Sequence, residues 1–444
     1  MKLSSHVIKS TIVGALGGLL FGFDTAVISG ATAQLTQQFH LSEAALGFTV
    51  ASALWGTVAG AIFAGIPGQR YGRRDSLRVM AAFYIISALG CAIAWNLSSL
   101  IAFRFIGGIG IGGSSVLGPM YIAELAPANW RGRLVGFFQV NVVVGILLAY
   151  ISNAFLGALH LGAAEWRWQL GVSGIPAVLF LAALFAIPRS PRWLLTKSRN
   201  VEALEVLRLT GVPDPEREMK DIITALKEEG TGTTDSLTSR KYRLPVMVAL
   251  TVGMFSQLTG INAVLYYLNN IFALAGASKI SGDLQAIAVG ATNLVATLIA
   301  MSIIDRFGRK KLLLSGTVGL IACLSAIGYI FYTRQHLHLL VWLLMGFIAC
   351  FAVSHGAVVW VYISEVFPNR MRAKGQSLGS SSHWISNAII SLVFPLLAKA
   401  SGAVPFFFFA AMMALDFFIV LFYYPETARV SLENMQHSIQ GTRT

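Results

Sequence analysis

The sequence is poor in charge. Asp, Glu, Lys and Arg make up only 12% of its 444 residues, whereas soluble domains carry about 25%. Its three cysteines (Cys91, Cys323 and Cys350) fall in apolar stretches at no metal-ligand spacing, which argues against a disulfide framework or a zinc site. A Walker loop, a nucleophile elbow and a cluster of metal ligands are also missing. The sequence therefore predicts no enzyme activity, no cofactor and no bound metal.

Hydrophobic residues take the place of the missing charge and make up 55% of the chain. A helix that spans a membrane needs about 20 mainly apolar residues. Runs of this kind cover residues 10–31, 45–67, 77–96, 98–122, 134–157, 168–187, 245–273, 284–304, 311–332, 338–363, 375–398 and 403–424. The sequence therefore predicts an all-α membrane protein with twelve transmembrane helices.

The net charge of +13 first suggests a negatively charged partner such as a nucleic acid. Its placement suggests another origin. Arg167, Lys279, Arg334 and Lys399 fall in loops on one side of the predicted helices, and nearly all other basic residues fall on the opposite side. That asymmetry follows the positive-inside rule and places both termini in the cytoplasm. We therefore attribute the charge to topology and to the anionic headgroups of the lipid bilayer, and predict no nucleic-acid partner.

Asp24 lies in the middle of the first apolar run. An ionisable side chain at the bilayer centre costs at least about 2.5–3.5 kcal/mol, so it indicates a function by default. It also argues against a cleaved signal peptide. Arg104, inside the predicted helix 98–122, is the natural partner, because each residue would otherwise be an unpaired buried charge. A pair that forms in one conformation and parts in another would couple to a proton; a static structural pair is the alternative interpretation.

The chain repeats itself. An Arg-x-Gly-Arg-Arg/Lys loop follows the second and the eighth predicted helices, and a proline-containing motif follows the sixth and the twelfth. Equivalent positions are Arg70 and Arg306 (236 residues apart), Glu124 and Glu365 (241 apart), and Pro188 and Pro425 (237 apart). Three features at nearly one offset predict two six-helix halves with the same topology. We predict an N-terminal half at 1–187, a cytoplasmic linker at 188–243, a C-terminal half at 244–424 and a cytoplasmic tail at 425–444.

The linker differs in composition, being rich in charge and broken by Pro213 and Pro215. Apolar residues nevertheless recur at helical spacing (Met219, Ile222, Ile223 and Leu226), which predicts short amphipathic helices. Two interpretations stay open: a solvated connection, or helices that pair with basic loops beneath the bundle.

Several motifs together resemble the sugar porter family of the major facilitator superfamily over nearly the full length. They are the two Arg-x-Gly-Arg-Arg/Lys loops, Pro119–Glu124 followed by Arg131-Gly132, Gln257–Asn262 followed by Tyr266-Tyr267, the Pro-x-Ser-Pro-Arg sequence ending at Arg192, and Pro425-Glu426-Thr427. The chain looks most like bacterial proton:sugar symporters and next like animal facilitative glucose transporters. The resemblance implies the major facilitator fold, with two pseudo-symmetric halves and a substrate site between them.

A sugar ring needs hydroxyl partners that donate and accept hydrogen bonds, and a flat apolar surface for its C–H face. Amides and indoles inside apolar helices meet those needs: Gln139, Gln257, Asn262, Asn293, Asn387, Trp360 and Trp384. The resemblance implies that these positions line the sugar site together with Phe21, Tyr266 and Gly356, and that Tyr266 and Tyr267 form an outer gate. For a single helix amide, an ordinary interhelical hydrogen bond is the alternative.

Charged residues at the predicted cytoplasmic helix ends suggest a network of ion pairs. Glu124 and Glu365 each precede an arginine, Arg131 and Arg372, by seven positions. With Arg70 and Arg306 they would form ion pairs that hold the two halves together in one state and break in the other. Ordinary positive-inside charge explains the arginines but not the matched glutamates.

The sequence departs from the family pattern at the sugar site, since Ser256 stands where a glutamine is usual and His383 where an amide is common. Both put the identity of the sugar in question rather than its class. Gly108–Gly113 matches a dinucleotide fingerprint but lies in an apolar helix, so we interpret it as a close-packing face. We expect Asp416 to contact a neighbouring helix and His355 to be a core histidine.

The sequence thus predicts a monomeric, proton-coupled symporter that imports a monosaccharide, glucose or a related hexose or pentose, across a bacterial cytoplasmic membrane by alternating access. A facilitative uniporter, in which Asp24 and Arg104 only shape the structure, is the closest alternative. A transporter-like sugar sensor and a membrane enzyme are more distant ones.

Overall fold

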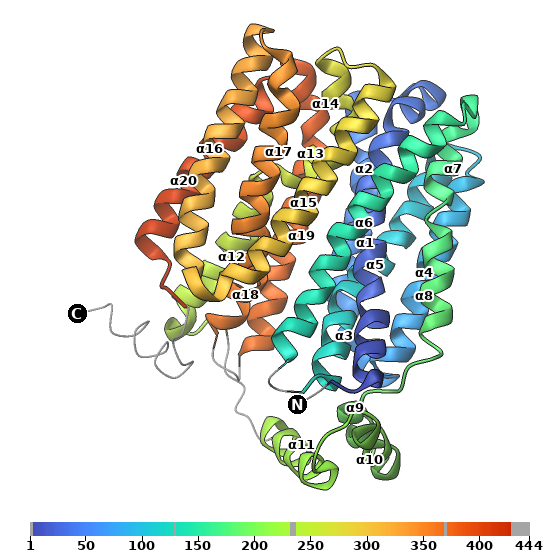
Figure 1. Cartoon of the computed structure of the whole chain (residues 1–444), viewed down its shortest axis with the longest axis vertical. Helices are drawn as coiled ribbons and strands as arrows, with labels where there is room; N and C mark the ends of the chain where they lie inside the picture. Colours follow the sequence, from blue (N-terminus) through green and yellow to red (C-terminus); the bar gives the residue numbers. More distant parts are fainter. Residues whose placement is uncertain (1–2, 128–129, 231–236, 368–370, 428–444) are drawn as a thin grey trace. The chain divides into compact units, whose positions relative to one another are not determined.

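The computed structural model describes residues 3–127, 130–230, 237–367 and 371–427, and within them it contains helices and no strand (Figure 1). The first part of the chain carries α1 (Ser5–Phe39), α2 (Glu43–Phe63), α3 (Gly65–Arg70), α4 (Arg73–Ala92), α5 (Leu97–Leu125), α6 (Arg131–Ala158), α7 (Glu165–Gly171) and α8 (Gly174–Ala183). Three shorter helices follow: α9 (Pro191–Thr196), α10 (Asn200–Leu209) and α11 (Pro215–Gly230).

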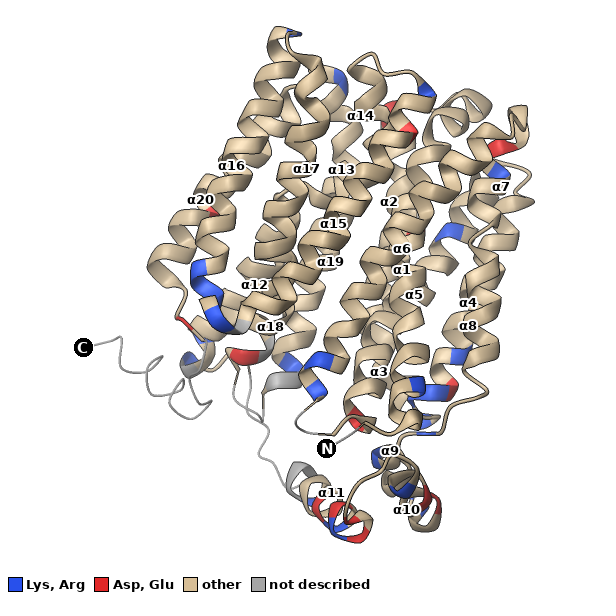
Figure 2. Cartoon of the chain, in the orientation of Figure 1, with Lys and Arg blue, Asp and Glu red and all other residues tan. Residues whose placement is uncertain are grey.

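The remaining helices are α12 (Arg243–Leu258), α13 (Ile261–Tyr266), α14 (Leu268–Leu274), α15 (Lys279–Phe307), α16 (Arg309–Thr333), α17 (Leu340–Phe351), the π-helix η4 (Ala352–Gly356), α18 (Ala357–Glu365), α19 (Arg372–Ala400) and α20 (Val404–Tyr423). Short 3₁₀ turns lie at Gly162–Ala164 (η1), Arg240–Tyr242 (η2) and Leu337–Leu339 (η3). Along the long helices, Lys, Arg, Asp and Glu concentrate near the ends, and the middle turns are almost free of them (Figure 2).

Eleven helical segments of the described chain are long and apolar enough to cross a membrane. The twelfth predicted run, 168–187, is present as α7 and α8, which are separated at Val172 and Ser173. Pro176 explains the break, because proline has no N–H to donate to the carbonyl of residue 172. The predicted run 245–273 is likewise divided into α12, α13 and α14, with Gly260 at a positive φ of 82° between the first two.

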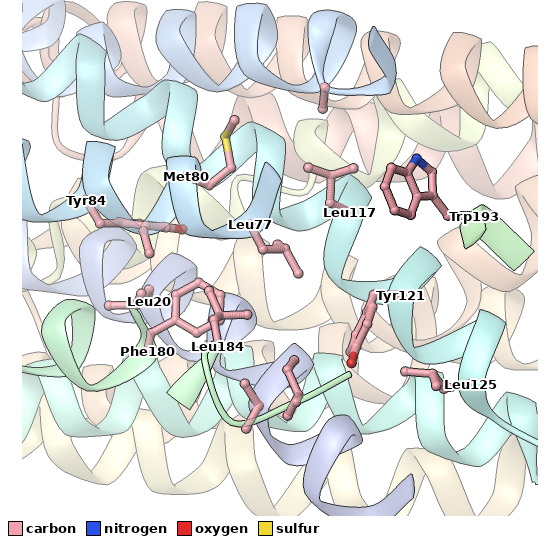
Figure 3. Packing of buried hydrophobic residues seen from close by; sticks show 14 of the residues in the cluster. Leu20, Leu77, Met80, Tyr84, Leu117, Tyr121, Leu125, Phe180, Leu184 and Trp193 are labelled. Atoms are coloured by element: carbon pink, nitrogen blue, oxygen red, sulfur yellow. The ribbon is translucent and has the colours of Figure 1, made fainter. Parts of the chain in front are cut away.

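The chain forms two compact units, which do not coincide with the predicted halves. One contains residues 1–24, 55–146 and 170–234; the other contains 25–54, 147–169 and 235–444. The core of the first unit gathers buried side chains of α1, α4, α5, α8 and α9, including Leu20, Leu77, Leu117, Phe180 and Trp193 (Figure 3). The core of the second gathers side chains of α12, α16, α18 and α20.

The predicted amphipathic helix of the linker is α11. Its apolar residues Met219, Ile222, Ile223 and Leu226 pack against the core of the first unit. Arg189, at the start of the linker, donates to Asp75 of α4 at 2.9 and 3.1 Å. The linker is therefore docked on its own unit by apolar packing and by an ion pair, rather than being a fully solvated connection.

Glycines set the distance between α1 and α6. A Cβ on Gly22 would overlap the carbonyl oxygen of Val142, and a Cβ on Gly145 would overlap that of Leu19. The predicted close-packing face of α5 is also confirmed, since a Cβ on Gly112 would overlap the carbonyl oxygen of Thr57. Because these contacts are with backbone atoms, a larger residue cannot be accommodated by a side-chain rotation.

Gly22→Ala should therefore destabilise the protein by about 1–3 kcal/mol, the usual cost of overpacking. Gly132→Ala is the matched control, because no atom lies within 4 Å of the Cβ position there. Thermal unfolding in detergent measures both. Equal transition temperatures for the two variants would contradict the close approach of α1 and α6.

Candidate functional site

Asp24, from the middle of α1, and Arg104, from the first third of α5, lie close together. The carboxylate oxygen Oδ2 lies 3.9 Å from an Arg104 guanidinium nitrogen, and the two side chains are 22% and 3% exposed. That distance allows electrostatic attraction but exceeds a hydrogen bond. The Arg104 Nε atom is buried and has no hydrogen-bond partner in the described part of the chain. The predicted pair is thus present, but its atoms are not locked in one hydrogen-bonded geometry.

A directed chain of hydrogen bonds links four polar residues of the second unit. Asn262 donates to Gln257 Oε1 at 2.8 Å, and Gln257 Nε2 donates to His383 Nε2 at 2.9 Å. The other imidazole nitrogen, Nδ1, lies 3.0 Å from Ser256 Oγ, whose own proton goes to the carbonyl of Gly253. The Gln257 amide nitrogen also lies 3.2 Å from Nδ1. Because its N–H group needs an unprotonated ring nitrogen as acceptor, we infer that His383 is neutral.

Aromatic rings stand beside this chain. The Trp360 ring centroid lies 4.8 Å from that of His383, which in turn meets Trp384 edge-on at 5.1 Å. Trp360 is 37% exposed, whereas Trp384 is only 2% exposed. Trp360 therefore offers an accessible apolar face next to the amides, and Trp384 is a packing residue in this conformation.

The other predicted sugar-lining residues are distributed over both units. In the second unit, Asn387 donates to the Tyr266 hydroxyl at 3.4 Å, and Asn293 is buried on α15 without a hydrogen bond to the cluster among the described residues. Gly356 ends η4, four residues before Trp360. Phe21 on α1 and Gln139 on α6 belong to the first unit, where both are partly exposed.

Tyr267, one of the predicted gate residues, lies at the break between α13 and α14. It is 2% exposed, its hydroxyl donates to the carbonyl of Ser391, and its ring stacks on Phe394 at 5.2 Å. The predicted gate residue therefore packs against α19 in this structure.

The predicted glutamates at the helix ends both form ion pairs. Glu124 binds Arg73 at 2.8 Å, and Glu365 binds Arg309 at 3.0 Å. The same arginines donate to the carbonyls of Gly68 and Ile304, at 3.0 and 3.3 Å. Equivalent positions of the internal repeat thus form the same kind of ion pair, once in each unit.

Sequence reasoning missed these two arginines. Arg70, Arg131 and Arg306, which it named, are exposed, and the Arg372 side chain lies outside the described residues. The signal was present, because Arg73 and Arg309 directly follow the glycines of the repeated loops, Gly72 and Gly308, whose positive φ values (91° and 88°) start the next helix.

A second network was missed because its members are far apart in the sequence. Lys279 donates to both carboxylate oxygens of Glu165, at 2.5 and 2.7 Å. Gln34 and Gln169 also donate to Glu165, which is only 3% exposed. Near it, Asn269 donates to Asp283 at 2.6 Å, and Thr32 donates to Asn270 at 2.5 Å. These contacts tie α1 and α7 to α14 and α15.

Comparisons with known proteins agree with this architecture. Residues 10–438 match the family described as "Sugar (and other) transporter". The chain is 36% identical to the D-xylose-proton symporter of Escherichia coli (strain K12), over 98% of this chain and 96% of the relative. It is 35% identical to the glucose transporter GlcP of Staphylococcus epidermidis, over 100% of both. The inward-open structure of the E. coli xylose transporter XylE is similar, with a TM-score of 0.86 at 34% identity, covering 97% of this chain and 99% of that one.

Arg73→Ala should destabilise the protein by up to about 3–5 kcal/mol, because it removes the cation that contacts the buried carboxylate of Glu124 and leaves only the more distant charge of Arg192. Arg131→Ala removes an exposed arginine and should change stability by less than about 0.5 kcal/mol. Chemical denaturation of the two variants in detergent tests the difference. A larger loss for Arg131→Ala would show that the predicted Glu124–Arg131 pair, and not Glu124–Arg73, carries the stability.

Proposed function

The chain belongs to the sugar transporter family, and from that premise we propose that it is a proton-coupled symporter that imports a monosaccharide by alternating access. Its fold is that of the major facilitator superfamily, with twelve helices in two halves, and the protein is a transporter rather than an enzyme. The observation that carries the proposal is the pair of opposite charges, Asp24 and Arg104, in the interior of the first unit.

The pair suits proton coupling for a physical reason. When Arg104 is close, its charge favours the ionised carboxylate of Asp24; when it is distant, burial favours the protonated form. A movement that changes a 3.9 Å separation therefore takes up or releases a proton. In a static ion pair we would instead expect the short, hydrogen-bonded geometry of charge-assisted contacts, at about 2.7–2.9 Å.

The second unit supplies chemistry for a sugar. The amides of Gln257 and Asn262 donate and accept, His383 is held neutral between them and Ser256, and Trp360 provides the apolar face. Sugar hydroxyls can replace the hydrogen bonds that these groups make to one another, so binding leaves no buried amide unsatisfied. This is a site for a neutral polyhydroxylated ligand, consistent with a hexose or a pentose.

Two devices of the second unit support alternating access. Tyr267 closes on α19, and the Glu165–Lys279 pair joins α7 to α15. From the distribution of basic residues along the sequence, we propose that these contacts lie on the outer side of a bacterial cytoplasmic membrane, with both termini in the cytoplasm. We propose that they close the outer path and open when the sugar enters, and that the protein acts as a monomer.

The function is tested by uptake of radiolabelled glucose and xylose into proteoliposomes, with and without an inward proton gradient. We expect accumulation above the external concentration only with the gradient. Equilibration that ignores the gradient would mean uniport and would leave Asp24 and Arg104 as a structural pair. Absence of uptake of both sugars would overturn the choice of these substrates and direct attention to Ser256 and His383.

Asp24→Asn should keep sugar exchange but lose uphill accumulation, because asparagine retains the shape and cannot bind a proton. The measurement compares counterflow, which needs no gradient, with gradient-driven uptake in the same proteoliposomes. Asp221→Asn makes the same change at an exposed aspartate of α11, outside the pair, and is the matched control. Retained accumulation by Asp24→Asn would exclude the coupling role.

A further inference from the structure

Two ionisable residues that the transport mechanism above does not use meet in the interior of the second unit. His355 of η4 and Asp416 of α20 are 1% exposed each, and the imidazole Nε2 lies 3.0 Å from the carboxylate oxygen Oδ2. The expected contact of Asp416 with a neighbouring helix is therefore present, and the expected core histidine is its partner. Phe351 covers one side of the imidazole, with its ring nearly parallel at 6.4 Å.

The hydrogen bonds around the imidazole identify where its protons are. Ser354 donates its own proton to the carbonyl of Cys350 at 2.6 Å, so its oxygen is left to accept from the imidazole Nδ1, 3.3 Å away. The contact with Ser354 is therefore satisfied when Nδ1 carries a proton. A second proton must lie between Nε2 and the carboxylate, because neither atom can bond the other without one.

This arrangement fixes the charge of the pair. With the second proton, the pair is either imidazolium and carboxylate or imidazole and carboxylic acid, and both have no net charge. Without it, only a single imidazole proton remains, and the pair keeps a net negative charge in a fully buried site. Either Nε2 then faces the carboxylate with a lone pair, or Nδ1 faces Ser354 without a proton, and both states are costly. The geometry thus favours the pair with no net charge.

The neighbouring helices offer no substitute for that proton. Five helices pack around the pair and carry other titratable or charged side chains in their described parts, and α12 carries one more. They are Lys279, Asp283 and Arg306 (α15), Arg309, Lys310, Lys311, Cys323, Tyr329 and Tyr332 (α16), Cys350 (α17), Tyr362 and Glu365 (α18), Lys374, His383 and Lys399 (α19), and Arg243 (α12). Neither His355 nor Asp416 forms a hydrogen bond or an ion pair with any of these described side chains. Tyr424, just beyond α20, is close enough to Asp416 to interact electrostatically.

His355 lies in a π-helix that leads directly into α18. A π-helix is rare and costs stability, and such segments occur frequently at functional sites. Here it lies directly before α18, whose Trp360 contacts His383 in the proposed sugar site. A change from π- to α-helical winding of η4 would shift His355 relative to Asp416 and rotate the part of the helix that carries Trp360.

We propose that His355 and Asp416 form a second proton-binding site, separate from Asp24 and Arg104. It holds one proton while η4 is a π-helix and releases that proton to water, leaving imidazole and carboxylate, when η4 rewinds and the two side chains part. The link between this site and the helix that carries Trp360 rests on the proposed transport function. Its occupancy itself is independent of that function.

Occupancy is tested without transport, by ¹⁵N spectroscopy of the full-length protein with labelled histidine in lipid nanodiscs. His355→Gln assigns the signal. In the unmodified protein we expect the imidazole to be doubly protonated, or protonated on Nδ1 with Nε2 sharing the proton of Asp416. In Asp416→Asn we expect one proton, on Nδ1, because the asparagine amide group can donate to an unprotonated Nε2 while Ser354 still accepts from Nδ1. An identical protonation pattern in both proteins would overturn the site.

The link to transport is tested by sugar counterflow at equal pH on both sides, in an Asp24→Asn background that removes the first proton site. We expect exchange still to fall at alkaline pH, by up to about tenfold per pH unit once the pair loses its proton. Adding His355→Gln and Asp416→Asn, which preserve a neutral hydrogen bond, should make the profile flat.

His338→Gln, the same change at an exposed histidine, is the control and should leave the profile as it is. Exchange that is already independent of pH in Asp24→Asn would overturn the link to transport. Loss of exchange in Asp24→Asn would count against the proposed function instead, and the spectroscopic result would still decide whether the second site exists.

Discussion

A charge inside an apolar bundle must be paired or neutralised, and this constraint accounts for the polar contacts of the chain. Desolvation of a single ion costs several kcal/mol, and in five pairs a buried or partly buried charged group accordingly has its partner on another element of the described chain. The pairs are Asp24–Arg104, Arg73–Glu124, Arg309–Glu365, Glu165–Lys279 and His355–Asp416. Their geometry differs: four pairs are at hydrogen-bond distance and fix helices to one another, whereas the nearest charged atoms of Asp24 and Arg104 are 3.9 Å apart.

The internal repeat gives these contacts their regularity. Arg73 and Arg309 occupy equivalent positions and reach a glutamate and a carbonyl in the same way. The same repetition joins the Tyr121 hydroxyl to Pro188 and the Tyr362 hydroxyl to Pro425. The compact units nevertheless cut across the predicted halves 1–187 and 244–424, because residues 25–54 and 147–169 are held to α14 and α15 by the network around Glu165. The compact units thus reflect the contacts made in this structure, whereas the sequence repeat predicts the two halves.

In the candidate sugar site, two residues that differ from the family pattern at distant sequence positions contact each other. Ser256 and His383 are 127 positions apart and look like two independent changes of polar residues. In the structure they touch, and together they orient Gln257 through a neutral imidazole. A smaller side chain on α12 is thus matched by a ring on α19, so that the hydrogen bonds of the site stay complete although its chemistry is altered.

The sequence by itself determined the class of the protein, its helices and most of the candidate residues, because apolar length, repeated loops and isolated polar residues are properties that can be counted along a chain. It also identified Glu124 and Glu365 as members of ion pairs, and Asp24 and Arg104 as partners. It could not identify Arg73 and Arg309 among many basic residues, nor join His355 to Asp416 or Glu165 to Lys279. Those contacts depend on which helix faces meet, and only the tertiary structure decided that, since a side-chain pair forms where packing brings two helices within a few ångströms.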